Sequence, residues 1–227
     1  MYKLISIVML MLMTSLSYAN DIYVTQSGAS LDLDITQDGQ NNTVGNSSTS
    51  SASVGATTIL NIDQIGNSNV ITYQIQGATY TGVINLVGNS NNVDLNCDST
   101  GNNSSCGTAN AVINFTGNSN DIDLDIGQTS SANTADVDIV GQSGSDSNVV
   151  AATVDGNSAI LTITINGDTN NYLIDIDGNG DINGHTLIHS HTGGTADVDI
   201  VQSGINDQYI NLTTSGDNHD IDIQQTD

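Results

Sequence analysis

Oxygen-bearing side chains recur at alternate positions in one short segment of this chain. The segment places glycine at its sixth position, Gly180, which is the spacing of a calcium-binding loop. Its twelfth position is Thr186 rather than glutamate, and no helical pattern flanks it. Calcium is therefore a candidate cofactor, with an ordinary polar turn as the alternative. The candidate ligands are Asp175, Asp177, Asn179 and Asp181.

Aspartates alternate with apolar residues elsewhere too. In an extended chain this spacing puts the carboxylates on one face, away from the apolar residues. We expect a solvated outer face that resists sideways aggregation, with weak calcium binding as the alternative. The sets are Asp32 and Asp34; Asp121, Asp123 and Asp125; Asp136 and Asp138; Asp175 and Asp177; Asp197 and Asp199; and Asp220 and Asp222.

Cysteine and histidine are the remaining residues with metal or redox chemistry. Cys97 and Cys106 bracket a polar insertion, and this spacing favours a local disulfide over free thiols or a metal pair. His189 and His191 would face one way on a strand, which suits zinc, but two ligands alone are more typical of polar surface. No catalytic triad, phosphate-binding loop or acid/base pair is apparent. We expect no enzyme activity.

Glycines recur every eleven residues, for example at Gly55, Gly66, Gly77 and Gly88. Short apolar strands separated by turns at a fixed period predict a solenoid, in which each unit covers the next. The fold class is therefore all-β: a β-solenoid of stacked strand–turn–strand rungs around a flat two-layer core. The expected corner glycines are Gly39, Gly66, Gly88, Gly117 and Gly167, and neighbouring asparagines also tolerate a positive φ.

The alternation also predicts which residues face inward. Leu60, Ile62 and Gln64 share one face, as do Ile113 and Phe115. Inward amides can stack on copies in adjacent rungs, although asparagines at corners often satisfy local backbone groups instead. The candidates for such a stacking ladder are Gln37, Gln64, Asn69, Asn91, Asn120 and Gln202.

The chain is expected to hold a secretory signal peptide at 1–19 and one repeat domain at 20–227. We expect loop insertions near 41–56, 97–106, 127–134 and 179–184, where the rhythm breaks. The 227 residues include 25 acidic groups and a single lysine, giving a formal net charge of −24. Such a chain is repelled by nucleic acid and anionic lipid, so neither is an expected partner. The apolar stretch near the N-terminus is too short for membrane insertion.

The unit Ser/Thr-x5-Gln-x-Gly-x2-Asn resembles the curlin repeat of curli amyloid subunits, and Thr58, Gln64, Gly66 and Asn69 match it fully. Gln37, Gly39 and Asn42 match it in part, and further segments carry only Gln-x-Gly, as at Gln202 and Gly204. The resemblance implies a secreted, cell-surface subunit of functional-amyloid fibres that serves adhesion and the biofilm matrix. Its implied partners are copies of itself and nucleator or secretion-channel proteins. The alternatives are a calcium-stabilised repeat adhesin, a surface or virion fibre spacer, and an ice-binding solenoid.

Overall fold

The regular structure of this chain consists of β-strands. The computed structural model describes residues 21–39, 42–45, 51–66, 68–97, 107–126, 134–142, 144–155, 158–177, 185–204 and 208–226. All regular elements in these ranges are strands, so the all-β prediction is confirmed. The predicted signal peptide at 1–19 lies outside the described residues.

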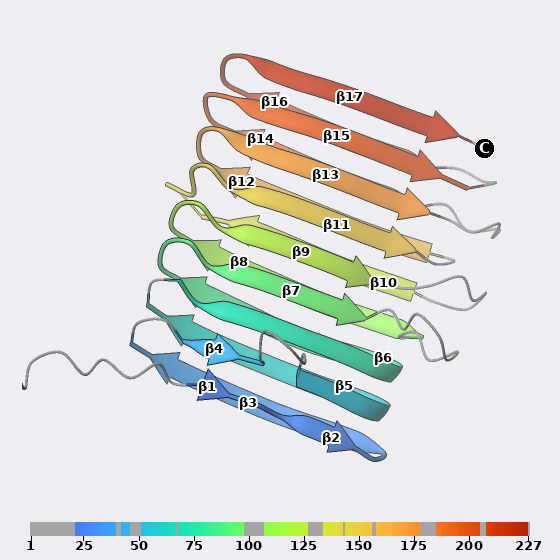
Figure 1. Ribbon diagram of the computed structural model, residues 1–227. Helices are drawn as coiled ribbons and strands as arrows, with labels where there is room; N and C mark the ends of the chain where they lie inside the picture. The colour runs from blue at the N-terminus through green and yellow to red at the C-terminus, as the bar shows by residue number, and fades with distance from the viewer. Residues whose placement is uncertain are drawn as a thin grey trace, which may run out of the picture.

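Two parallel sheets face each other along the length of the molecule (Figure 1). The back sheet contains β3 (Ser30–Asp38), β8 (Thr108–Thr116), β10 (Thr134–Gly141), β12 (Ser158–Asn166), β14 (Thr186–Thr192) and β16 (Tyr209–Ser215). The front sheet contains β1 (Asp21–Ile22), β2 (Thr25–Ser27), β4 (Thr43–Val44), β7 (Asn92–Cys97), β9 (Asp121–Ile126), β11 (Val149–Asp155), β13 (Asn170–Asp177), β15 (Ala196–Ser203) and β17 (His219–Thr226). Two long strands, β5 (Ser51–Ile65) and β6 (Val70–Val87), turn a corner and run through both sheets. The chain therefore winds as a β-solenoid, as predicted.

The strand register explains the eleven-residue rhythm. Val70 pairs with Asn92 in the front sheet, and Ile59 pairs with Thr81 in the back sheet. Each pair is 22 positions apart, which is one arm in each sheet. Longer coils carry their extra residues between strands: Thr79 pairs with Thr108, 29 positions on, across the segment between β7 and β8.

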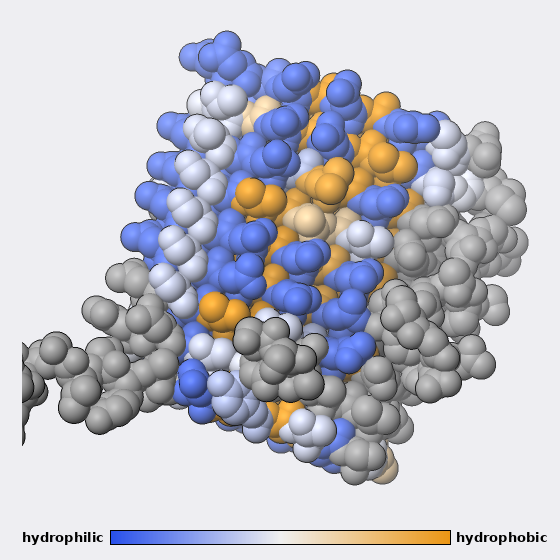
Figure 2. Space-filling model, in the orientation of Figure 1, coloured by the Kyte–Doolittle hydropathy of each residue, from blue (hydrophilic) through white to orange (hydrophobic). Residues whose placement is uncertain are grey.

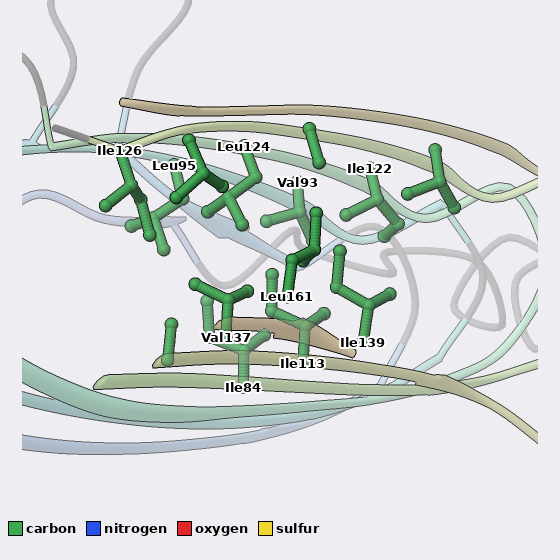
Figure 3. Close-up of a cluster of buried hydrophobic side chains, with 14 of the residues drawn as sticks. Ile84, Val93, Leu95, Ile113, Ile122, Leu124, Ile126, Val137, Ile139 and Leu161 are labelled. Atoms are coloured by element: carbon green, nitrogen blue, oxygen red, sulfur yellow. The ribbon is translucent and has the colours of Figure 1, made fainter. Parts of the chain in front are cut away.

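Alternating aliphatic residues from the two sheets meet in a thin interior. Val93, Leu95 and Ile122 point from the front sheet toward Ile84 and Ile113 of the back sheet (Figure 3). All five side chains have no exposed surface. Burying an aliphatic side chain of this size contributes roughly 1.5–3 kcal/mol. One coil alone cannot cover its own inward side chains, so this burial requires stacked coils.

Polar side chains dominate the outer faces, as the aspartate spacing predicted. The outer face of the front sheet carries many hydrophilic side chains, and its apolar side chains gather mainly over the C-terminal coils (Figure 2). On the back sheet, Asn61 donates to Asp34 at 2.7 Å and Asn85 donates to Asp63 at 2.6 Å. Side-chain amides of the neighbouring coil thus donate hydrogen bonds that stabilise these carboxylates.

One predicted insertion is shorter than expected. Residues 43–44 and 51–56 of the segment near 41–56 belong to β4 and β5. Thr57 pairs with Ser30, 27 positions back, so this coil has only five residues beyond the basic 22. Residues 46–50 lie outside the described residues, as do 98–106, 127–133 and 178–184 of the other predicted loops.

Candidate functional site

Stacked asparagines line the corner where the chain passes from the back sheet to the front sheet. Asn91 donates through Nδ2 to Oδ1 of Asn120 at 2.9 Å, and Asn120 donates likewise to Asn148 at 3.0 Å. Asn148 continues the ladder to Asn170 at 2.9 Å. These side chains are buried, so each hydrogen bond replaces one that water would have made.

The same asparagines also satisfy local backbone groups. Nδ2 of Asn120 donates to the carbonyl oxygen of Gly117 at 2.7 Å, three residues back. Its Oδ1 accepts the backbone N–H of Asn91 at 3.1 Å. Both uses of asparagine considered from the sequence therefore occur in one side chain. The sequence interpretation omitted Asn148 and Asn170, although the Gly-x2-Asn spacing of Gly167 and Asn170 signalled the second.

Inward-facing glutamines stack near the two ends of the solenoid. Nε2 of Gln64 donates to Oε1 of Gln37 at 2.6 Å, in the coils nearest the described N-terminal end. Nε2 of Gln225 donates to Oε1 of Gln202 at 2.9 Å in β17 and β15. Between these pairs, the equivalent inward positions hold apolar residues such as Leu86 and Ile176.

Serines, more than asparagines, take the left-handed conformation at these corners. Positive φ values occur at Ser68, Ser90, Ser119 and Ser147. The prediction that asparagine would share this role with glycine holds at Asn218. Four predicted corner glycines do have a positive φ, namely Gly39, Gly66, Gly88 and Gly117. Gly167 has none, and its lack of a side chain serves the close approach of Ser145.

We expect Gly117→Ala to lower the free energy of unfolding by at least about 2 kcal/mol. Gly117 has φ of 122°, and a Cβ there would lie 2.6 Å from the carbonyl carbon of Gly88 in the next coil. Gly144→Ala is the control, because it has φ of 84° but open space around its Cβ, so it costs only the backbone strain. Urea titration followed by circular dichroism measures both. Equal losses in the two variants would contradict the close-packed corner.

The histidines correct the sequence interpretation. His185, His189 and His191 are buried rather than part of a polar surface. Nδ1 of His191 lies 2.9 Å from the hydroxyl of Tyr172, and Nδ1 of His185 accepts the backbone N–H of Ala159 at 3.1 Å. In the described ranges, no three His, Cys, Asp or Glu side chains are grouped to hold a metal ion.

The cysteine and calcium candidates lie partly outside the described residues. Cys97 is buried and disulfide-bonded, and Cys106, the chain's other cysteine, is outside the described ranges. Asp175 is exposed on the outer face of β13, while Asn179 and Asp181 are not described.

Like charges crowd the middle of the front sheet. Asp123 pairs with Asp94 in the neighbouring coil and shares its outer face with Asp121. Desolvation, together with the charges of Asp94 and Asp121, raises the pKa of Asp123 above its usual range. Ionised Asp123 thus destabilises the folded state at neutral pH, and its protonation in acid relieves that cost.

The last strand exposes an apolar edge. Among the described residues β17 pairs only with β15, so its second edge has no neighbouring strand. Its inward residues Ile221 and Ile223 are 37% and 47% exposed, whereas their neighbours in β15, Val198 and Ile200, are buried. At the other end β3 pairs only with β5 within the described chain, and its Leu33 is only partly buried.

Comparison with known proteins identifies no relative: no family model, curated protein or solved structure matches this chain. Among the described residues there is no helix that is long and apolar enough to cross a membrane. The β-solenoid fold is consistent with a repeat fibre or adhesin subunit.

Proposed function

We propose that this chain is a secreted structural subunit that stacks end to end into curli-like extracellular fibres. The observation that carries the proposal is the unpaired edge of β17, with Ile221 and Ile223 exposed on it. An open strand edge with apolar side chains is a template for adding another strand. A second copy supplies such a strand, because every described pairing is parallel and translation along the axis preserves strand direction.

The residues at the two ends of the front sheet match in kind. Following the register through the sheet, Ile221 lies in the same column as Ile22, and Gln225 lies in the same column as Gln26. Stacking one copy on another therefore places isoleucine over isoleucine and extends the Gln202 to Gln225 amide ladder. One strand position beside β16 in the back sheet stays open in this arrangement, because among the described strands the front sheet extends one strand beyond the back sheet.

Charge favours growth along the axis over sideways association. The formal net charge is −24, and the outer faces carry the aspartates. Two such faces repel each other, while the inward positions of the end strands present isoleucine and glutamine. The match of Thr58, Gln64, Gly66 and Asn69 to the curlin repeat supports a role in surface adhesion and biofilm matrix, with nucleator and secretion-channel proteins as further partners.

We expect the chain beginning at Asn20 to form fibres, and Ile221→Asp/Ile223→Asp to slow their elongation at least about tenfold. The two carboxylates would sit on the stacking edge and repel the incoming copy. Ile160→Asp is the matched control, because Ile160 is an exposed outward residue away from the edge. Light scattering and electron microscopy follow assembly. The proposal fails if the parent chain stays monomeric or if the edge variant elongates like the parent.

A further inference from the structure

Histidines interrupt an otherwise apolar interior in β14. His189 pairs with Ile163 on one side and Leu212 on the other. His191 takes the position that is Ile165 in the coil before it. Both histidine side chains are 0% exposed. Two ionisable rings therefore occupy positions in the dry core that Ile163 and Ile165 fill in the preceding coil.

Most ring nitrogens of the pair have no hydrogen-bond partner. Both nitrogens of His189 and Nε2 of His191 are buried without one. The ring of Tyr172 packs edge-on against His189 with centroids 4.4 Å apart, and its hydroxyl bonds Nδ1 of His191. A protonated imidazole needs two acceptors and a counter-charge, and these surroundings offer neither to His189.

The titratable groups that face the pair are few. Tyr172 faces it from β13, and His219 of β17 packs edge-on against His191 with ring centroids 5.3 Å apart. Asp168, in the corner before β13, is the one carboxylate that favours the charged form of His191. The inward residues of the adjacent strands are neutral: Ile163 and Ile165 of β12, Val198 and Ile200 of β15, and Leu212 and Thr214 of β16.

We propose that this histidine cluster makes β14 to β17 an acid-sensitive end of the solenoid, which opens on protonation while the coils before it stay closed. Protonation places like charges on His189 and His191 in a space that offers neither ring a route to water. The last coils yield first because β16 and β17 each have a strand on only one side among the described residues. The inference concerns the stability of this end in the unassembled chain, where no second copy covers β17.

The direction of the pH effect follows from burial. Desolvation, and then the neighbouring His191, lowers the pKa of His189 to about 4. Desolvation and His219 likewise lower the pKa of His191. The fold therefore has its full stability above the ordinary histidine pKa of 6.5, where the rings are neutral. That stability is lost as the pH falls from 6.5 toward about 4. Asp123 behaves oppositely, because its raised pKa means that acid stabilises the middle coils.

Hydrogen exchange at pH 7 and pH 5 tests the proposal, with protection factors corrected for the intrinsic rate. We expect opening of β14 to β17 to increase at least about twenty-fold between pH 7 and pH 5 from the lowered pKa of His189 alone, while β8 to β12 keep or gain protection. His189→Leu/His191→Leu should abolish the increase, since it restores an aliphatic core. If the double variant does not fold at pH 7, His189→Ile alone is read in the same way.

Asp123→Asn is the control, because it removes the central like charge and leaves the histidines intact; it should open at the C-terminal end as the parent does. Uniform opening along the chain at pH 5 would overturn the proposal. So would C-terminal opening that persists unchanged in the leucine variant.

Discussion

Ile113→Asp should lower the free energy of unfolding by at least about 4 kcal/mol. Ile113 is fully buried between Ile84 and Ile139 of the neighbouring coils, and it faces the front sheet across the interior (Figure 3). A carboxylate there has no partner and must either stay charged in an apolar layer or take up a proton. Because each coil contacts only its neighbours, we expect the array to break at β8. Urea titration and peptide-resolved hydrogen exchange measure the loss and its location.

Thr116→Asp is the matched control, since it adds the same carboxylate to the same strand. Thr116 is half-buried at the end of β8 and its side chain faces outward. We expect its free energy of unfolding to change by less than about 1 kcal/mol. Comparable losses in the two variants would mean that position 113 is not inside the fold.

Asn120→Leu should cost roughly 3 kcal/mol, although it makes the side chain more apolar. The substitution removes hydrogen bonds to Gly117, Asn91 and Asn148, and it leaves the buried backbone N–H of Asn91 without its acceptor. An unsatisfied buried donor costs more than the added aliphatic surface returns. The melting temperature and urea midpoint measure the effect.

Asn110→Leu is the control for this substitution, because Asn110 is exposed on the outer face of β8. We expect that variant to remain within about 0.5 kcal/mol of the parent. A stable Asn120→Leu protein would show that the corner ladder does not hold the coils together.

The alternation of residue types carried most of the information about the core. Leu60, Ile62 and Gln64 are buried as predicted, since period two fixes which side chains face inward. The same parity places His189 and His191 inward beside Leu187. The sequence interpretation was wrong about them because it weighed the polarity of histidine above its position in the strand.

The remaining differences arise where the sequence has no alternation. The Ser/Thr tract around residues 46–53 gives no sign of which residues form the strand, so the insertion was placed too broadly. At one corner Ser145 stands where other corners have glycine, which hid Asn148 from the Gly-x2-Asn pattern. The positive φ of the corner serines follows from the corner geometry that the neighbouring coil imposes, and residue preference alone does not reveal it.

Distances along one column of the back sheet test the solenoid most directly. Asp34, Asp138 and Asn211 occupy the same outward column. Asp138 lies four coils from Asp34, and Asn211 lies seven coils from Asp34. Pulsed electron paramagnetic resonance on spin-labelled pairs 34/138 and 34/211 should give distances that differ by about 14 Å, which is three strand spacings. Distances that are equal, or a 34/211 distance shorter than the 34/138 distance, would contradict a stack of parallel coils in register.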